Sequence, residues 1–213
     1  MIQSTSGIIL RTRPLTETSL IVHWLTPDCG RLATVAKGAR RSKSVFAGKL
    51  DLFYAADFSF SRSQRSELHT LREVGLRQTH AAIREDILKL QQAAYGAALV
   101  EQATETETPI PEIFELTQGF LKNLCAQPPQ PQNILAFELK LLNELGLAPD
   151  LEETHLTPGA RKIVQALQLG DWNASSRLKL SDSQAGELRQ FLHGFMIFHL
   201  GRIPRGRVAA LGG

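Results

Sequence analysis

Apolar and polar positions follow a short, strand-like period in the first 80 residues. Short apolar runs are separated by turn signals, as where the run 19–26 ends in Pro-Asp-Cys-Gly at 27–30. The stretch 51–61 alternates, which would put one face on Leu52, Tyr54, Ala56, Phe58 and Phe60. We therefore expect five strands, at 7–13, 19–26, 31–36, 51–61 and 68–74. Five short strands favour a small closed barrel, because closure removes exposed sheet edges.

After residue 80 the period lengthens to that of helices. Apolar residues recur at steps of three and four, which predicts one helical stripe through Ile83, Ile87, Leu90 and Ala94. The prolines at 109 and 111 should open a helix that runs to about 124. The stretch 134–145 is apolar on most sides and ends at Gly146, so we expect a central helix there.

Capping signals mark two further helices. Thr157 before a proline resembles an N-cap followed by proline at the first helical position. Ser181 and Gln184 have capping-box spacing. They precede a predicted apolar stripe formed by Leu188, Phe191, Leu192, Phe195 and Phe198. The expected fold class is therefore α+β, with a five-stranded barrel at 1–80 and an all-helical domain at 81–213.

Composition and charge separate the same two parts. The chain has 213 residues, 43% of them hydrophobic, which suits a globular protein with its own core. Residues 1–80 hold twelve Lys or Arg against six Asp or Glu, and residues 81–213 hold twelve against fifteen. The two cysteines are far apart, which favours a reduced, cytoplasmic setting. We expect no signal peptide and no membrane span, because the apolar runs are too short.

The excess positive charge gathers in one stretch, AKGARRSKSVFAGKL at 36–50. From Gly30 to Leu50 the sequence has no acidic residue. This pattern favours contact with phosphates, and Gly38 and Gly48 would let the backbone approach a partner closely. The alternative is a solvated surface loop. Phe46 and Trp24 are candidates for stacking on bases, although aromatics in a small barrel more often belong to its core. The DNA-binding candidates are Arg11, Arg13, Arg31, Lys37, Arg40, Arg41, Lys43 and Lys49.

Catalytic patterns are missing from the sequence. Gly48 and Lys49 lack the other residues of a P-loop, and neither G-x-S-x-G nor H-E-x-x-H occurs. A run of Asp150, Glu152, Glu153 and His155 is better interpreted as a solvated loop than as a metal site. We expect no enzyme activity, no catalytic residue, no metal and no cofactor. A metal-dependent nuclease using Asp51 or Asp57 remains an alternative, as does a pure adaptor that binds an acidic protein tail.

Several segments together resemble the bacterial RecO family of recombination mediators. These segments are GIILRTRPLTETSLIVHWLTPDCGRLATVAKGARRSKS, LHTLREVGL, FELKLLNELGLAPDLE and FLHGFMIFHLGRIPRGR, in that order. The resemblance implies an oligonucleotide-binding (OB-fold) barrel followed by a helical domain. It also implies binding of single- and double-stranded DNA, annealing of complementary strands and loading of recombinase in DNA repair, in the cytoplasm at the nucleoid.

The resemblance further implies two protein partners. They are the single-strand-binding protein, through its acidic C-terminal tail, and the mediator RecR. Basic residues of the helical domain that would suit such a tail are Lys140, Arg189, Arg202 and Arg205. Many family members carry a four-cysteine zinc site after the LGLAPDL-like segment, but this sequence has no cysteine there. The residues alone do not distinguish DNA from RNA, so an OB-fold RNA-binding protein stays open.

Overall fold

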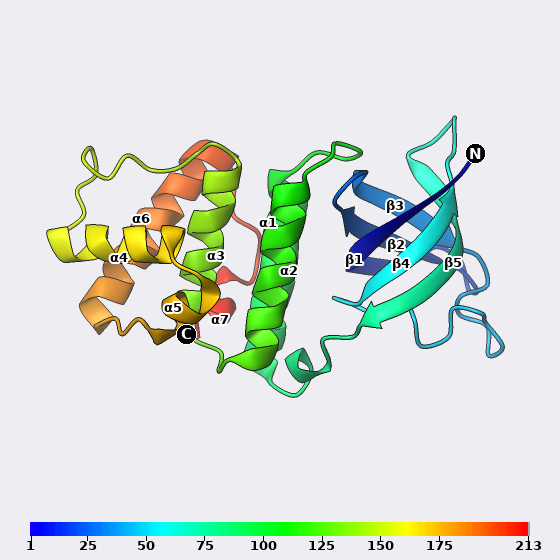
Figure 1. The fold of residues 1–213 in the computed structure, drawn as a ribbon, viewed down its shortest axis with the longest axis horizontal. Helices are drawn as coiled ribbons and strands as arrows, with labels where there is room; N and C mark the ends of the chain where they lie inside the picture. The colour runs from blue at the N-terminus through cyan, green and yellow to red at the C-terminus, as the bar shows by residue number, and fades with distance from the viewer. Residues whose placement is uncertain (213) are drawn as a thin grey trace. The chain divides into compact units, whose positions relative to one another are not determined.

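Five strands and a series of helices make up the protein in a computed structural model that describes residues 1–212 (Figure 1). The strands are β1 (Ile2–Pro14), β2 (Leu20–Thr26), β3 (Gly30–Ala36), β4 (Ala55–Ser61) and β5 (Leu68–Gln78). The helices are the 3₁₀ turn η1 (Ala81–Ile83), α1 (Ile87–Ala103), α2 (Pro111–Ala126), α3 (Pro131–Glu144), α4 (Pro158–Leu169), α5 (Trp172–Arg177), α6 (Asp182–Leu200) and α7 (Arg207–Ala210). The predicted class, a five-stranded barrel followed by helices, is confirmed.

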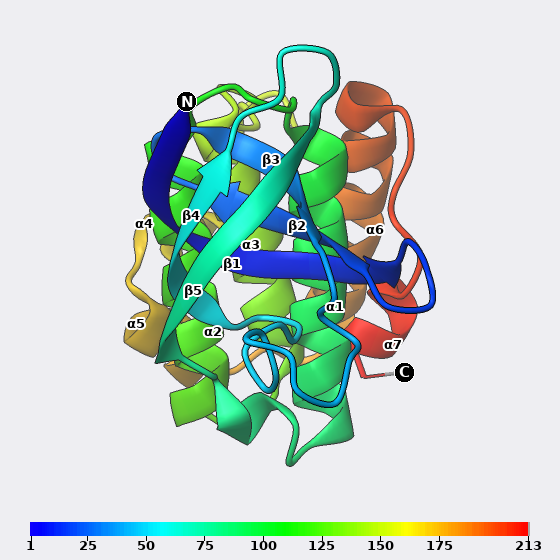
Figure 2. The same cartoon turned by 90° about the vertical axis from the view of Figure 1, so that its right-hand side faces the viewer.

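The strands close into a barrel in the order β1-β2-β3-β5-β4 (Figure 2). Neighbours are antiparallel except β3 and β5, which pair in parallel over residues 33–35 and 68–70. β1 is long because it serves two neighbours: residues 2–8 pair with β4 and residues 8–14 pair with β2. A register shift between Ile9 and Arg11 bends the strand where it passes from one neighbour to the other.

Aromatic side chains fill the interior of the barrel. The ring of Trp24 stacks on that of Phe58 with centroids 4.1 Å apart, and both residues are buried. The indole Nε1 of Trp24 donates to Thr34 Oγ1 at 2.9 Å, so its polar atom is satisfied inside the core. The expected alternation along 51–61 holds only from Ala55 onward. It fails before that because Phe53 has φ +66°, which interrupts extended backbone.

The segment Thr104–Glu115 groups with the barrel, although α1 separates the two in sequence. Glu107 N–H donates to Arg31 O at 2.8 Å, and the Arg31 guanidinium donates to Thr104 Oγ1 at 2.8 Å. Glu107 also accepts from His69 Nε2 at 2.8 Å, while His69 Nδ1 accepts from Ser63 N–H. These bonds attach the segment to β3 and β5. The compact barrel unit is therefore residues 1–80 together with 104–115.

Gly30 shows how closely that segment approaches the barrel. Its φ is +66°, and a Cβ atom built on it would lie 1.9 Å from Thr108 O. The glycine therefore serves the hairpin turn and also leaves room for a backbone almost 80 residues later in the sequence.

In the helical unit, residues 81–103 and the chain from Leu116 onward, α3 is central. It packs against α1, α4, α5 and α6, and its residues from Gln132 to Leu139 are all buried. Gly146 follows it with φ +71°, as the stop signal predicted. Thr157 caps α4 and Ser181 with Gln184 forms the capping box of α6, so both capping predictions are confirmed.

Two predicted apolar stripes hold only in part: Ile83, Leu188 and Leu192 are buried as expected, but other members are exposed. α1 begins at Ile87 after an Asp86 cap, whose Oδ1 accepts from Leu88 N–H at 2.8 Å. Ile87 and Ala94 are exposed, because the buried side of α1 consists of residues such as Ala93, Tyr95 and Gly96. In α6 the buried residues are Leu188, Leu192 and Met196, whereas Phe198 is 83% exposed.

Candidate nucleic-acid interface

Three strand ends meet at one end of the barrel. Pro14 pairs with Leu20, and Leu20 pairs with Ala36, so the end of β1, the start of β2 and the end of β3 are adjacent. The β1–β2 connection at 15–19 and the residues that follow Ala36 therefore emerge together. We call residues 37–49 the basic segment. Its position follows directly from the register of these strands; the sequence pattern had predicted the strands and the β2–β3 hairpin, but not the register.

The basic segment is an ordered series of turns. Backbone N–H groups of Ala39, Arg41, Ser44, Ala47 and Lys49 each donate to the carbonyl three residues earlier, at 3.0–3.3 Å. Each turn satisfies its own backbone groups locally. The backbone of the basic segment therefore has a defined conformation, which fixes where its side chains begin.

Phe46 anchors the segment to the barrel. Its side chain is 6% exposed and belongs to the barrel core, where Trp24 is fully buried. Ala39 and Leu50, at either end, also pack against that core. Because Phe46 and Trp24 lie in the interior, neither is placed to stack on a base.

Arg40 connects the basic segment to the β1–β2 connection. Its backbone N–H donates to Thr18 O at 3.0 Å, and its Nη1 donates to Thr16 O at 3.1 Å. Carbonyl acceptors position a guanidinium without neutralising it. Arg40 therefore keeps its charge at the surface while it fixes the segment.

The remaining cations of the segment are open to an incoming ligand. Lys37, Arg41 and Lys43 are exposed and Lys49 is half-buried. Within residues 1–212, none of the five basic side chains at 37–49 forms an ion pair. Their positive charge is therefore not cancelled within the fold.

The two glycines of the segment have a local reason to be there. Gly38 and Gly48 both adopt φ +70°, a conformation that side chains disfavour. The turn geometry alone therefore explains them, without a requirement for close approach of a partner.

Of the three predicted DNA-binding arginines that lie on strands, only Arg13 is at the same end of the barrel as the basic segment. It is exposed, and it precedes Pro14, the β1 residue that pairs with Leu20. Arg11 lies two residues earlier in β1, farther from this end of the barrel, and pairs with His23. Arg31 begins the far end of β3, about 16 Å of strand from Ala36. Its guanidinium is occupied by Thr104.

His23 is a neighbour of these arginines that the sequence analysis did not single out. Burial, followed by the nearby charges of Arg11, Arg13 and Arg31, lowers its pKa to about 4. Strand pairing could have found it, because Arg11 and His23 are register partners. Burial is the main cause of the low pKa, and the further lowering by the three arginines reflects the positive charge around His23.

Asp51 and Asp57 are the acidic residues of the barrel on which the nuclease alternative rests. Asp57 is exposed and pairs with Arg77 Nε at 2.7 Å. In the part of the chain that the structure describes, no group of three or more His, Cys, Asp or Glu side chains is arranged to hold a metal, including the 150–155 run. Burial raises the pKa of both Cys29 and Cys125, which disfavours the reactive thiolate.

Of the four basic residues in the helical unit that would suit an acidic tail, two are hydrogen-bonded to backbone carbonyls and two are exposed. Lys140 Nζ donates to Gln168 O at 3.0 Å and to Gly170 O, and burial lowers its pKa. Arg189 donates to Leu211 O at 3.0 Å. Arg202 and Arg205 are exposed.

Among residues 1–212, no helix is long and apolar enough to span a bilayer.

A closed five-stranded barrel with an unpaired basic surface is the architecture of the oligonucleotide-binding class of small barrels. Residues 1–80 match the model for "Recombination protein O N terminal", and residues 84–157 match "Recombination protein O C terminal". The chain belongs to the RecO family.

Several curated relatives support this assignment. The DNA repair protein RecO of Anaeromyxobacter sp. strain K is 33% identical over 147 residues, which cover 69% of this chain and 58% of the relative. That of Bacillus pumilus is 31% identical, over 72% of this chain and 59% of the relative. The protein of Desulfatibacillum aliphaticivorans is 28% identical over 95% of this chain and 93% of its own length. The matched region thus spans little more than half the length of the first two relatives.

Proposed function

We propose that this protein is a DNA-binding recombination mediator that acts in DNA repair. In this proposal it binds single- and double-stranded DNA through the basic segment and Arg13. It anneals complementary strands and helps to load recombinase onto strands coated by single-strand-binding protein. The observation that carries the proposal is the ordered, acid-free basic segment, whose cations have no ion-pair partner within residues 1–212.

Charge neutralisation is the chemistry that this site offers. Two complementary strands repel each other as polyanions, and Lys and Arg lower that repulsion and release counterions when they bind phosphates. Annealing needs no catalytic side chain, so this role requires no enzyme activity. Since phosphates are the same in every sequence, binding by the basic segment is expected to be nearly independent of base sequence.

The proposal also includes two protein partners, which are supported by the membership of the chain in the RecO family. A mediator must recognise strands already coated by single-strand-binding protein, and the acidic tail of that protein and RecR are the proposed contacts. In the helical unit, Arg202 and Arg205 are the exposed cations for a tail carboxylate, since Lys140 and Arg189 are held by backbone carbonyls.

Salt dependence of binding tests the DNA site. Lys37, Arg40, Arg41, Lys43, Lys49 and Arg13 offer about six phosphate contacts, so the log–log salt slope on single strands should be roughly −4. The double substitution Arg41→Glu and Lys43→Glu removes two of these contacts. It should make the salt slope less negative by about 1.4 or more and weaken binding to all sequences alike. These two side chains are preferable to Arg40, which also holds the β1–β2 connection.

A matched charge change provides the control. Lys162→Glu with Lys179→Glu alters net charge equally at exposed positions of the helical unit. This control should bind and anneal like the parent protein. If the Arg41 and Lys43 variant, shown to be folded, annealed complementary strands as fast as the parent, the proposed site would be refuted. Tighter binding of RNA than of DNA of the same sequence would instead favour an RNA-binding protein.

A further inference from the structure

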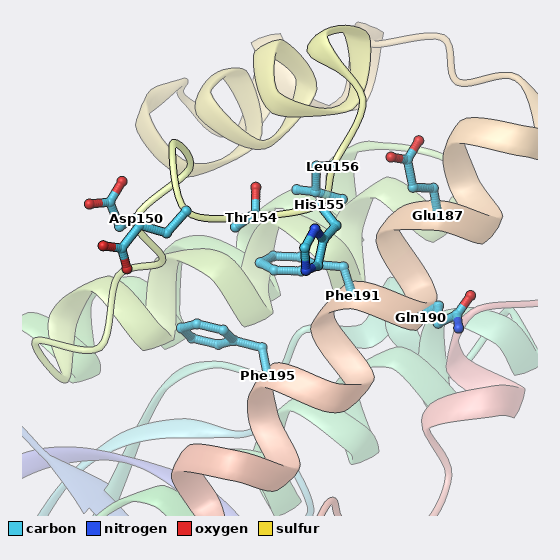
Figure 3. Close-up of a pocket in the computed structure, with 9 residues that line it drawn as sticks. Asp150, Thr154, His155, Leu156, Glu187, Gln190, Phe191 and Phe195 are labelled. Atoms are coloured by element: carbon cyan, nitrogen blue, oxygen red, sulfur yellow. The ribbon is translucent and has the colours of Figure 1, made fainter.

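A second candidate site lies in the helical unit and is chemically unlike the basic segment. A cavity of about 520 Å³ opens between the 150–156 loop and α6 (Figure 3). The residues that line it are Asp150, Glu153, Thr154, His155, Leu156, Glu187, Gln190, Phe191 and Phe195. In Figure 3 the rings of Phe191 and Phe195 project from α6 toward the loop that carries Asp150 and His155.

The charge of the cavity is negative. Its lining contains three carboxylates and neither lysine nor arginine. Glu187 is held by Thr157, whose N–H and Oγ1 donate to its two oxygens at 2.6 and 2.9 Å. Asp150 and Glu153 are exposed, and Asp150 uses one oxygen to accept from Glu152 N–H at 3.0 Å. Two carboxylates at the rim are therefore open to a cation.

The 150–156 loop is fixed by hydrogen bonds from Arg161 of α4. Arg161 donates to Thr154 O at 2.8 Å and to Leu156 O at 3.1 Å, and Leu156 is buried. The charge of Arg161 is therefore directed at backbone carbonyls. These bonds give the rim a fixed shape.

An aromatic ladder continues from the cavity along α6. The centroids of Phe191 and Phe195 are 5.6 Å apart, those of Phe195 and His199 are 4.3 Å apart, and those of His199 and Phe198 are 4.9 Å apart. Phe198 is 83% exposed, so the ladder ends in an aromatic ring at the surface, and a contiguous exposed apolar patch of this kind marks interaction sites. From Phe191 to Phe198 the helix rises about 10 Å.

We propose that the cavity and the ladder together bind a basic, apolar segment of a partner protein, with an arginine side chain in the cavity. A guanidinium stacks on aromatic faces and pairs with carboxylates, and the cavity offers both. Phosphates and acidic tails are disfavoured by the rim carboxylates. The ladder extends beyond the cavity, which suits a peptide chain better than a small molecule. This inference does not depend on the proposed DNA function.

Fluorescence polarisation with the full-length protein tests it. The probe is a fluorescein-labelled peptide AARFRLAA, compared with AAEFELAA, in about 50 mM salt. The arginine peptide should bind and the glutamate peptide should not. Asp150→Asn with Glu153→Gln should weaken binding about tenfold, and Phe198→Ala by about threefold or more. Phe198 is exposed, so this substitution leaves the fold intact.

Glu144→Gln with Asp182→Asn is the matched control, because it removes the same charge from exposed residues outside the cavity lining. It should bind the arginine peptide like the parent. Equal binding of the two peptides, or no loss in either the rim variant or the Phe198 variant, would overturn the proposal. Self-association of the free protein that the rim variant abolishes would also overturn it, because the occupant would then be a second copy of the chain.

Discussion

His23 is neutral at pH 7 because burial and three arginines oppose its protonation. Burial is the larger cause, and Arg11, Arg13 and Arg31 add to it. A phosphate group bound near Arg11 and Arg13 would offset their charge and raise the pKa of the imidazole. Because burial is the larger cause and would persist, the pKa would still lie below its ordinary value of 6.5.

The first prediction concerns stability as pH falls. In the unfolded chain His23 should titrate near its ordinary pKa of 6.5, whereas in the folded protein the pKa is about 4. Between these values the unfolded state binds more protons, so the contribution of His23 to stability is present above pH 6.5 and is lost as pH falls toward 4. Urea unfolding at pH 7 and pH 5 should show a smaller loss for His23→Gln than for the parent. Equal losses would contradict this assignment.

The second prediction concerns a buried ion pair in the helical unit. Arg207 of α7 donates from Nε and Nη2 to Glu138 at 2.7 and 2.9 Å, and Tyr95 OH donates to the same carboxylate at 2.6 Å. Burial, then the Glu138 charge, raises the pKa of Tyr95. Arg207→Met should cost about 3–5 kcal/mol in unfolding free energy, because it leaves Glu138 buried without a counterion.

A double variant distinguishes two causes of the destabilisation by Arg207→Met: the loss of the ion pair with Glu138 and the loss of side-chain packing. Glu138→Gln removes the charge while it keeps an acceptor for Tyr95. Combined with Arg207→Met, it should recover much of the lost stability, as measured by urea denaturation. Strictly additive losses from the two substitutions would show that the ion pair is not what Arg207 supplies.

At the scale of elements, Phe46 is the most deeply buried apolar contact between the basic segment and the barrel core. The third prediction is that Phe46→Ala costs about 3–5 kcal/mol, because Phe46 is 6% exposed within the barrel core. Phe46→Leu should cost less, since it keeps most of the buried volume. Amide hydrogen exchange at 38–49 should accelerate in Phe46→Ala. If exchange in this segment stayed unchanged in a folded Phe46→Ala protein, the segment would be held by its turns alone.

Local signals predicted element ends better than buried faces. The Ser181 capping box and the proline after Thr157 were found because their bonds are local. The buried face of α1 was missed because it contains small residues: a Cβ on Gly96 would come within 2.7 Å of the Phe120 ring. A helix that packs closely through Ala and Gly does not show its contact face as a stripe of large apolar side chains.

At the scale of the whole molecule, charge along the sequence located the basic segment but not its exact membership. The acid-free stretch was visible from residue types alone. Arg31, however, has its partner at Thr104, 73 residues away, and no local pattern reports such a bond. In the same way, Arg40 acts in part as a structural link through Thr16 and Thr18. Long-range pairing therefore decides which cations of a basic sequence face a ligand.

The fourth prediction is that the protein folds without zinc. Cys29 and Cys125 lie in different compact units, and residues 1–212 contain no group of three or more metal-ligating side chains arranged around one point. Metal analysis of the purified protein should give well under one zinc per chain, and dialysis against EDTA should leave the thermal midpoint unchanged. A stoichiometric zinc that survives dialysis would refute this.

The bonds from residues 104–108 to the barrel also fix an order of events during synthesis. When the last residue of β5 leaves the ribosome, the carbonyl of Arg31 and the imidazole of His69 still lack their partner, Glu107. About 30 more residues must be translated first, which takes roughly 1.5–6 s at bacterial rates of elongation. Throughout that interval the nascent barrel has all five strands yet lacks its final contacts. Its completion is therefore tied to the emergence of α1, the first long helix of the other unit.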